Sequence, residues 1–320
     1  MRVTVTGATG FLGGRLARRL VGEGHEVAGL GRDERAGAAL AADGVGFHRV
    51  DLARTSPEDP VLDADAIVHC AALSTLWGPW ADFQRANVQV SAMLARAAAL
   101  RGARLVHISS PSIYNATGLT RDIGEETVPT SFESSYARSK WLAEQQVHAI
   151  APSALVLRPR GIYGPGDRSI MPRVARIVGS GRMPRLSRGE VWTQLTHVDN
   201  VVEAIVLGLG SKLSGPVNVT DDRTIGLWAT LDRVADALGV PRPHGHLPPR
   251  LAEGAAAVAE RVCRVLPGRP EPPVTVASLR LITRGMTLDL RRARDELGYR
   301  PVVGAEGLDA VIEALGKGRA

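Results

Sequence analysis

The stretch that decides the fold is the start of the chain, Met1-Arg-Val-Thr-Val-Thr6 followed by Gly7-Ala-Thr-Gly10-Phe-Leu-Gly13. The first part is short and rich in β-branched residues, which predicts a strand. Helical periodicity begins after the glycines, so they form a turn between a strand and a helix. Gly7 permits the tight turn, Gly10 leaves room for a pyrophosphate, and Gly13 allows close helix packing. The segment predicts the phosphate-binding turn of a dinucleotide-binding domain.

The second informative feature is the pair Tyr136 and Lys140, within Ser135-Tyr136-Ala-Arg-Ser-Lys140. The chain has only four tyrosines and three lysines, so a chance match at this spacing is rare. Residues four apart lie on one face of a helix. An ammonium near a phenol lowers the phenol's pKa from about 10, toward the range used in general acid–base catalysis. An exposed helix with an incidental tyrosine and lysine is the alternative interpretation.

Composition bounds the class of protein. The chain of 320 residues, with 44% apolar and 22% charged residues, is long enough for one large core and a smaller lobe. The net charge of +6 is spread along the chain and aromatic residues make up only 4%, which argues against a nucleic-acid partner. Cys70 and Cys263 form neither a disulfide framework nor a metal pattern, and the histidines lack zinc-like spacing. We therefore expect no metal site.

Cysteine content and the apolar pattern also indicate the cellular compartment. Two cysteines in a chain of this length favour a reducing environment. No stretch is long and apolar enough to cross a bilayer, and the predicted first strand leaves no room for a signal peptide. We expect a cytoplasmic protein.

Strand-like and helix-like segments alternate through the first half of the chain, which predicts an α/β fold with a doubly wound parallel sheet. After the first strand, further strands are expected at Glu26–Gly31, Gly46–Val50, Ala66–Cys70, Arg104–Ile108 and Ala154–Leu157, and the clearest helices at Asp82–Leu100 and Ser134–Ile150. Proline and glycine increase from Gly164 onward. We expect a dinucleotide-binding domain over residues 1–165 with a return segment at about 197–219, and a smaller substrate-binding lobe from residues 166–196 and 220–320.

The end of the second strand indicates which cofactor binds. Sites of this type place an acid there for the ribose 2′-hydroxyl of NAD, or an arginine for the 2′-phosphate of NADP. Here Gly31 stands at the acidic position and Arg32 follows, so NADP(H) is favoured over NAD(H). Asp33 comes one residue too late but could still reach a ribose hydroxyl. Asp51 and Leu52, after the third strand, are placed to meet the adenine, although Asp51 could equally be a turn carboxylate.

Hydroxyl side chains follow the fifth strand, in His107-Ile-Ser109-Ser110-Pro-Ser112-Ile-Tyr114. Because strand ends line the ligand crevice of a doubly wound sheet, these hydroxyls should face the reactive end of the cofactor. A hydroxyl beside a tyrosine can bind a carbonyl oxygen and share the charge of the forming alkoxide. Alone the segment could be a serine-rich turn. Together, Ser110, Tyr136 and Lys140 predict a site for carbonyl reduction.

These motifs resemble those of the extended short-chain dehydrogenase/reductases, nearly end to end. The matching segments are the glycine turn, His69-Cys-Ala-Ala72, Ser110, Tyr136, Lys140, Leu157-Arg-Pro-Arg-Gly-Ile-Tyr-Gly-Pro-Gly166, His197-Val-Asp199-Asn and the stretch from Thr287 to Pro301. Within that family the chain is most similar to the 3β-hydroxysteroid dehydrogenase-like branch, which includes bacterial 2-alkyl-3-oxoalkanoate reductases. The resemblance implies Tyr136 as acid/base, Lys140 on the nicotinamide ribose, Ser110 on the substrate oxygen and a homodimer built on the helices at Asp82–Leu100 and Ser134–Ile150.

The turn, the strand ends and the resemblance together give the expected cofactor contacts. They are Gly7, Thr9, Gly10, Phe11, Leu12, Gly13, Arg32, Asp51, Leu52, Ala71, Ala72, Tyr136, Lys140, Pro159 and Ile162. The expected substrate contacts are Leu73, Trp77, Ser112 and Tyr163.

One departure from the family pattern narrows the chemistry. Nucleotide-sugar 4,6-dehydratases have an Asp-Glu pair just after the serine or threonine, where this chain has Pro111 and Ser112. Dehydration is therefore not expected. The loop from Ala71 to Trp80 brings Trp77 and Trp80 near the expected substrate entrance, which suits a lipophilic substrate better than a nucleotide sugar. Both tryptophans could instead be core or lobe contacts.

A helix is expected from Pro248 to Leu266, with Leu251, Val258 and Val262 among the apolar residues near one face. Amphipathic helices usually turn that face to a core, so we expect this helix to cap the smaller lobe. A lid over an apolar ligand and a weak contact with a membrane surface are the alternatives.

The sequence thus predicts an NADP(H)-dependent reductase or dehydrogenase of a lipophilic ketone or secondary alcohol, such as a 3-oxo acid or a steroid-like or polyketide-like compound. A nucleotide-sugar epimerase or reductase is the alternative within catalysis. A non-catalytic NADP-binding sensor is the alternative of another class, and the intact set of Ser110, Tyr136 and Lys140 argues against it.

Overall fold

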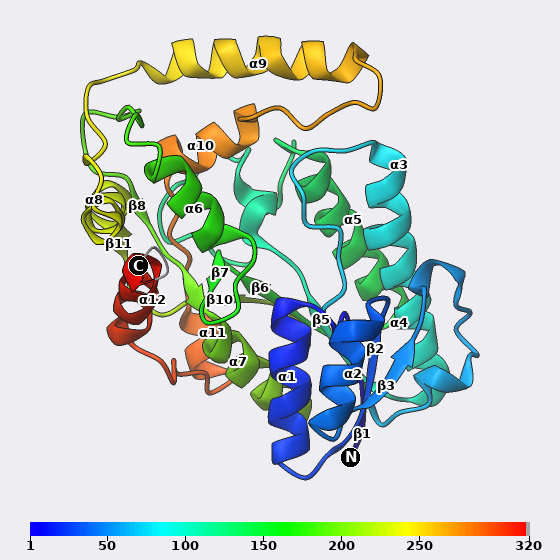
Figure 1. Cartoon of the computed structure of the whole chain (residues 1–320). Helices are drawn as coiled ribbons and strands as arrows, with labels where there is room; N and C mark the ends of the chain where they lie inside the picture. The colour runs from blue at the N-terminus through cyan, green and yellow to red at the C-terminus, as the bar shows by residue number, and fades with distance from the viewer. Residues whose placement is uncertain (318–320) are drawn as a thin grey trace.

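The computed structural model describes residues 1–317, and its centre is a parallel sheet of seven strands in the order β10-β6-β5-β4-β1-β2-β3 (Figure 1). The strands are β1 (Arg2–Thr6), β2 (Glu26–Gly31), β3 (Gly46–Arg49), β4 (Ala66–His69), β5 (Arg104–Ile108), β6 (Leu155–Pro159) and β10 (Gly215–Val219). The chain runs from β1 outward to β3 and then crosses to β4 on the other side of β1. Doubly wound sheets bind ligands at the carboxyl ends of the strands near such a reversal.

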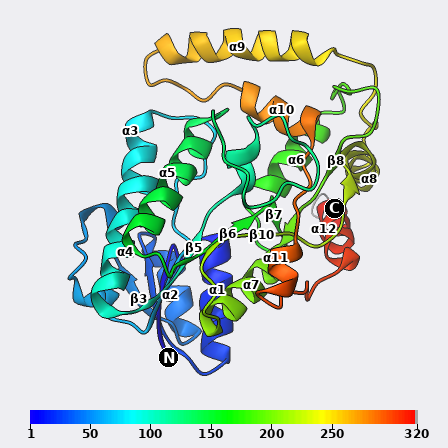
Figure 2. The same cartoon turned by 180° about the vertical axis from the view of Figure 1, so that it is seen from behind.

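Helices cover both faces of the sheet, as Figures 1 and 2 show. On one face lie α1 (Phe11–Gly22), α2 (Glu34–Ala42) and α7 (Val198–Gly210); on the other lie α4 (Val90–Arg101) and α5 (Ser135–Ile150). Leu16, Leu20 and Ile205 are fully buried on the first face, and Leu94 and Val147 on the second. Short helical segments fill the connections: η1 (Leu52–Arg54), η2 (Pro60–Leu62), α3 (Trp80–Phe83), η3 (Gln84–Gln89) and η4 (Pro111–Tyr114). The predicted doubly wound α/β fold is confirmed.

Most predicted boundaries agree with the observed ones to within one or two residues. β2 and β5 have the predicted bounds, whereas β6 begins one residue later than predicted and extends to Pro159. The predicted helix at residues 82–100 is three contiguous segments, α3, η3 and α4, of which η3 is a π-helix. Ser134, predicted as the first residue of a helix, is instead the N-cap of α5, and its side chain accepts a hydrogen bond from Ala137 N.

After β6 the chain leaves the sheet and then returns to it. β10 pairs in parallel with β6, with Leu157 opposite Val217. The predicted return segment thus contains α7 and β10. The remaining elements are β7 (Ile162–Tyr163), α6 (Ile170–Val178), β8 (Trp192–Thr193), β9 (Thr196–His197), β11 (Ile225–Gly226), α8 (Leu227–Leu238), α9 (Pro249–Val265), α10 (Val276–Arg284), α11 (Arg291–Asp295) and α12 (Ala305–Lys317). The predicted limit at residue 165 stays a prediction.

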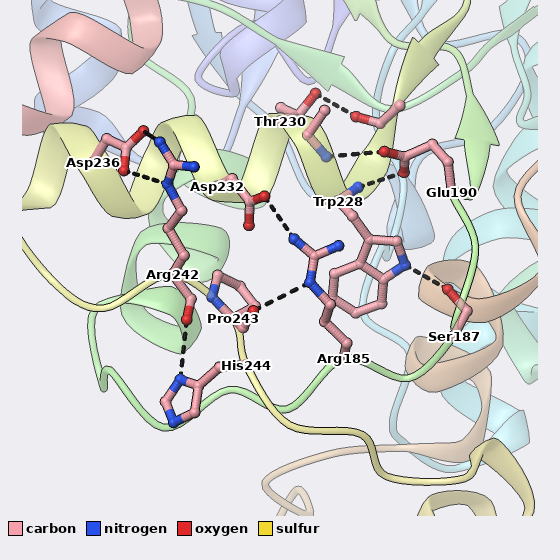
Figure 3. A network of polar contacts seen from close by, with 12 residues as sticks. Arg185, Ser187, Glu190, Trp228, Thr230, Asp232, Asp236, Arg242, Pro243 and His244 are labelled. Atoms are coloured by element: carbon pink, nitrogen blue, oxygen red, sulfur yellow. Dashed lines mark hydrogen bonds and ion pairs between the residues drawn. The ribbon is translucent and has the colours of Figure 1, made fainter.

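The smaller lobe has its own apolar core and its own polar network. Trp228, Leu231 and Val234 of α8 are almost fully buried in this core. Glu190 accepts hydrogen bonds from Trp228 N (2.7 Å) and Ala229 N (3.1 Å) at the start of α8, as Figure 3 shows. A carboxylate there satisfies main-chain donors that lack an acceptor within the helix and interacts favourably with the helix dipole. Arg185 pairs with Asp232 at 2.6 Å, so α8 is fixed to the preceding loop.

Helix α9 does not pack as predicted. Only Ala252 and Ala256 of this helix are buried, whereas Leu251, Val258 and Val265 are 64%, 59% and 83% exposed. Figures 1 and 2 show α9 along one end of the molecule, with α10 beneath it. The predicted apolar face therefore does not meet a core, but α9 does cap the smaller lobe, because Ala252 and Ala256 on another side of the helix belong to the core of that lobe. Its inner side contacts α10 through Glu253, which binds Arg280, and Glu260, which accepts a hydrogen bond from Val276 N.

Candidate active site

The glycine turn lies at the carboxyl end of β1 and opens α1. Gly7 has a φ of +68°, in the left-handed region that favours glycine, and a Cβ on it would lie 2.8 Å from Ala71 N, just after β4. A Cβ at Gly13 would lie 2.3 Å from the carbonyl oxygen of Gly7. Gly10 is exposed at the N-cap of α1, where main-chain N–H groups have no acceptor within the helix. The turn therefore fits a pyrophosphate at a helix N-terminus.

The end of β2 presents an arginine and no free carboxylate. A Cβ at Gly31 would lie 2.6 Å from Thr9 Oγ1, so an acidic side chain does not fit there beside Thr9. Arg32 is exposed. Asp33, which the sequence left as a partner for a ribose hydroxyl, is instead the N-cap of α2 and accepts a 3.0 Å hydrogen bond from Ala36 N.

Asp51 and Leu52 follow β3, which lies next to β2 at the edge of the sheet. Asp51 Oδ1 accepts a hydrogen bond from Ala53 N (3.2 Å) and caps η1, which is the turn-carboxylate role weighed from the sequence. Leu52 packs on the core beneath the sheet. Their contact with the adenine stays a prediction.

Ser110 and Tyr136 come together at the carboxyl end of β5. Ser110 follows β5 and is the N-cap of η4, where its Oγ accepts a hydrogen bond from Ser112 N (3.2 Å). A side-chain hydrogen bond between Ser110 and Tyr136 lowers the pKa of the phenol, but burial raises that pKa by more. Tyr136 is therefore a neutral phenol near pH 7, with a proton to donate. Ser112 Oγ is buried beside them with no hydrogen-bond partner among the described residues.

Lys140 follows one helical turn after Tyr136 on α5, with only 2% of its surface exposed. Its Nζ donates a 2.6 Å hydrogen bond to the carbonyl oxygen of Ile108, the last residue of β5. Burial lowers the pKa of Lys140 to about 8, although Glu144 opposes that shift. The expectation that Lys140 lowers the pKa of Tyr136 is not supported, because burial dominates and Ser110 provides the only lowering contribution found.

Asn87, which the sequence analysis missed, joins three parts of the site. Its Oδ1 accepts a hydrogen bond from Leu73 N (2.7 Å), and its Nδ2 donates to Leu73 O (3.1 Å) and to Ser139 Oγ (2.8 Å). It thereby fixes the loop after β4 to α5, next to Lys140. Asn87 lies in the π-helical segment η3, and such segments are frequent at functional sites. A buried asparagine in an otherwise helical pattern was the available signal.

Comparison with known proteins agrees with this geometry. Residues 3–219 match the NAD dependent epimerase/dehydratase family. The chain belongs to that family, the extended short-chain dehydrogenase/reductases. A 2-alkyl-3-oxoalkanoate reductase from Stenotrophomonas maltophilia is 31% identical over 325 residues, covering 96% of each chain. A ketoreductase of 4-hydroxy-2-methyl-3-oxo-4-farnesyl-3,4-dihydroquinoline-1-oxide from Stigmatella aurantiaca is also 31% identical, covering 98% of this chain and 96% of the relative.

Solved structures match over the whole length. The UDP-glucuronic acid 4-epimerase from Bacillus cereus, solved in complex with NAD, superposes with a TM-score of 0.75 at 20% identity, covering 98% of this chain and 99% of the epimerase. At that identity the likeness shows the shared fold. This extended short-chain dehydrogenase/reductase is an NAD(P)-dependent oxidoreductase.

A buried ion pair joins α5 to β6 near Ser110. Glu144 of α5 and Arg158 of β6 pair at 2.5 Å, with side chains only 5% and 2% exposed. Glu144 also accepts a hydrogen bond from Ser109, next to Ser110, and Arg158 donates to Tyr114 of η4. Removing one partner of a buried pair leaves an uncompensated charge, which is strongly destabilising. The network fixes β5, β6, η4 and α5 to one another, and the sequence analysis did not predict it.

The remaining residues predicted to contact the cofactor or the substrate lie in different surroundings. Trp77 touches the lobe: its Nε1 donates to Arg269 O (3.0 Å), and the Arg264 guanidinium lies 5.5 Å from its ring centre. Tyr163 is 2% exposed and its hydroxyl donates to Asp221 (2.8 Å), so the structure places it in the core and not at a ligand surface. Pro159 ends β6 and Ile162 packs on the core nearby. Leu73 is half-buried in the loop clamped by Asn87, and Ala71 and Ala72 precede it.

Residues 1–317 contain no group of His, Cys, Asp and Glu side chains arranged to hold a metal ion. Within the same residues, no helix has the length and apolar character needed to cross a membrane. Cys70 and Cys263 are free thiols.

Proposed function

We propose that this protein is an NADP(H)-dependent reductase of a lipophilic ketone that also acts in the reverse direction on the secondary alcohol. The observation that supports this most directly is the hydrogen-bonded pair of Ser110 and Tyr136 at the end of β5, together with Lys140, which binds the carbonyl oxygen of Ile108 at the same strand end. The activities of the two relatives, an oxoalkanoate reductase and a ketoreductase, agree with carbonyl reduction. The substrate classes proposed are 3-oxo acids and steroid-like or polyketide-like ketones.

The cofactor would be held by the glycine turn, by Arg32 and by Lys140. The N–H groups of the first turn of α1 would bind the pyrophosphate, because they lack acceptors within the helix. Arg32 would pair with a 2′-phosphate, since Asp33 is engaged as the cap of α2. When bound, the dihydronicotinamide supplies a hydride to the carbonyl carbon.

The protein's own residues would handle the proton. Tyr136 donates its phenolic proton to the carbonyl oxygen, and the raised pKa keeps that proton available at neutral pH. Ser110 donates a hydrogen bond to the same oxygen, so that the developing negative charge is shared. The ketone gains one hydride and one proton and becomes a secondary alcohol. Lys140, with a pKa near 8, can then return a proton toward Tyr136.

Absence of carboxylates at the elimination positions supports reduction over dehydration. Pro111 is buried at the start of η4, and Ser112 has a buried hydroxyl, so neither position offers an acid. The site therefore has a proton donor for the carbonyl oxygen but no second acid next to it.

Steady-state assays with purified protein test the proposal. We expect NADPH oxidation with ketones such as 3-oxo acids and their 2-alkyl derivatives, and a lower kcat/KM with NADH. Turnover of UDP- or GDP-sugars with NAD retained through purification would instead establish the epimerase alternative. Failure to oxidise NADPH or NADH with any ketone of a broad panel would favour a non-catalytic sensor.

We further propose a homodimer through the region of α3, η3, α4 and α5. Figures 1 and 2 show α4 and α5 side by side at one edge of the sheet domain. Light scattering tests this directly, and a monomer at micromolar concentration would refute it.

A further inference from the structure

Among residues 1–317, one guanidinium is buried without a carboxylate partner. Arg160, just after β6, has 9% of its surface exposed. Its Nε and Nη2 donate to Thr193 Oγ1 at 3.1 and 2.9 Å, and its Nη1 lies 3.1 Å from the Met286 sulfur. All these partners are neutral. Burial lowers the pKa of Arg160 to about 10, which reflects how poorly its charge is solvated.

The nearby Arg158 shows how a buried guanidinium is usually accommodated, by pairing with a carboxylate. Arg158 is also buried, but Glu144 compensates its charge with two hydrogen bonds. A buried charge without an opposite partner is costly. The cost at Arg160 is unexplained by the protein's own contacts and would be offset by an anionic ligand.

Arg160 lines a cleft in which positive charge predominates. The cleft is bordered by Asn115, Gly118, Leu119, Thr120, Glu133, Arg160, Arg280, Leu281, Arg284, Gly285 and Met286. Glu133 is the one acid among these residues, and it is already paired with Arg280 (3.2 Å) and Arg284 (3.0 Å). Arg280 also pairs with Glu253 (3.1 Å), so Arg280 and Arg284 both have carboxylate partners, whereas Arg160 has none. Burial raises the pKa of Glu133, although both arginines oppose that shift.

The cleft adjoins the catalytic residues along the chain. Asn115 directly follows η4, which Ser110 caps, and Glu133 stands three residues before Tyr136. Arg160 follows β6, the strand paired with β5. The segments that carry Ser110 and Tyr136 therefore also carry lining residues of this cleft.

We propose that Arg160, with Arg280 and Arg284 at the rim, forms a binding site for a carboxylate on the ketone substrate. Guanidinium groups bind carboxylates in a matched, two-bond geometry, and a low-dielectric site strengthens such bonds. The inference rests on the proposed reductase function and specifies that the substrate is an oxo acid and not a neutral ketone. Leu281 and Met286 provide apolar surface beside the charge.

The test compares Arg160→Gln with the wild type, using decanoate and methyl decanoate as competitors of ketone reduction and as ligands in thermal-shift titrations. We expect decanoate to bind at least ~10-fold more weakly to the variant, since a hydrogen bond to a charged group contributes about 1.5–3 kcal/mol. Methyl decanoate should be unaffected. Arg160→Lys should recover part of the affinity, and Arg223→Gln, which alters an exposed arginine outside the cleft, should match the wild type.

Equal decanoate affinity in wild type and Arg160→Gln would overturn the proposal, as would inorganic phosphate competing as well as decanoate. If the wild type reduces no ketone, the proposed function fails, but the thermal-shift titration still decides whether a carboxylate site exists. If the wild type reduces ketones but Arg160→Gln leaves the decanoate affinity unchanged, the carboxylate site is refuted and the proposed reductase function stands.

A second inference rests on α9, independently of the active site. Leu251, Ala255, Val258, Val262 and Val265 recur at the spacing of one helical face, and all are exposed. Arg250 and Arg261 are exposed on the same helix, and Arg269 follows it, whereas Arg264 pairs with Glu260 (3.4 Å) and lies over the Trp77 ring. The acids of the helix point the other way: Glu253 binds Arg280 of α10, and Glu260 accepts a hydrogen bond from Val276 N of α10 and pairs with Arg264.

We propose that this outward face of α9 docks on an anionic lipid bilayer. Arginines beside an apolar stripe fit lipid headgroups and acyl chains together. A second copy of the chain fits less well, because a two-fold contact along α9 would bring the same arginines together.

Vesicle flotation tests this with the full chain. We expect binding to vesicles containing phosphatidylglycerol, weaker binding to phosphatidylcholine alone, and at least ~10-fold loss with Val258→Asp or Val262→Asp, because either change places a charge in the apolar stripe. Val302→Asp alters an exposed valine elsewhere and should bind as the wild type does. Absence of vesicle binding by the wild type, or a dimer that Val258→Asp dissociates, would overturn the proposal.

Discussion

Lys140 Nζ donates a hydrogen bond to the main-chain carbonyl oxygen of Ile108 across 2.6 Å. Ile108 ends β5, and Ser110 follows two residues later, so this bond fixes α5 against the segment that presents Ser110. The lysine therefore positions the strand end as well as bringing charge to the site.

Tyr136→Phe should lower kcat for ketone reduction by at least ~100-fold, because the phenol is the proton donor for the carbonyl oxygen. The glycine turn, where we propose that the pyrophosphate binds, is untouched, so NADPH should still bind with near wild-type affinity in a fluorescence titration. Near wild-type turnover by this variant would refute the proposed mechanism.

Ser110→Ala should move the pH profile of alcohol oxidation. Oxidation needs the phenolate, so its kcat/KM rises as pH increases through the pKa of Tyr136. The hydrogen bond from Ser110 lowers that pKa, and its removal should shift the alkaline limb to higher pH. Ser112→Ala leaves that hydrogen bond in place and is the control. A limb at the same pH in both variants would contradict the assignment.

Lys140→Met should change how stability depends on pH. The folded-state pKa of Lys140, about 8, lies below the unfolded value of about 10.4, so between these values the unfolded state binds more protons. The wild type should therefore gain free energy of unfolding relative to the variant as pH rises from 8 to 10.5, by up to about 3 kcal/mol. Below pH 8 the difference should be constant. Urea unfolding at several pH values measures this, and a difference that falls with rising pH would refute it.

Arg32→Ala should raise KM for NADPH by roughly 10- to 100-fold with little change for NADH, since hydrogen bonds to charged groups contribute about 1.5–3 kcal/mol. Asp33→Ala is the matched control: it removes the cap of α2 and should cost about 1 kcal/mol of stability without changing cofactor preference. Equal effects of Arg32→Ala on both cofactors would disprove recognition of the 2′-phosphate.

Gly13→Ala should destabilise the protein and weaken cofactor binding, because its Cβ would lie 2.3 Å from the Gly7 carbonyl oxygen. Gly22→Ala, in the same helix, meets nothing within 4 Å and should stabilise by up to about 1 kcal/mol. Thermal unfolding of both variants checks the pair. Similar melting temperatures would contradict the packing argument.

The sequence was sufficient for features that depend on local pattern. The bounds of β2 and β5, the glycine turn and the spacing of Tyr136 and Lys140 follow from residue types at short range. The pairing of Glu144 with Arg158 and the bonds of Asn87 join segments distant in the chain, so no local pattern contains them. The direction of the pKa shift of Tyr136 could not be predicted without knowing that the residue is buried, because burial raises this pKa by more than the hydrogen bond with Ser110 lowers it.

The orientation of helix α9 could not be predicted from the sequence for a different reason. Its periodicity identified an apolar face correctly, but periodicity does not specify which side meets the protein. The acids Glu253 and Glu260 bind α10 and so determine the orientation. Tyr163 shows the converse, because its place in a family motif near the cofactor did not reveal its buried partner Asp221.

The return of the chain to β10 has a practical meaning for protein engineers. Because the strand beside β6 comes from residues 215–219, a fragment cut at residue 165 would leave β6 as a bare sheet margin, prone to self-association. The predicted substrate-binding lobe comes from residues on both sides of α7 and β10. Replacing it with the lobe of a related enzyme would accordingly need two grafts and not a single C-terminal replacement.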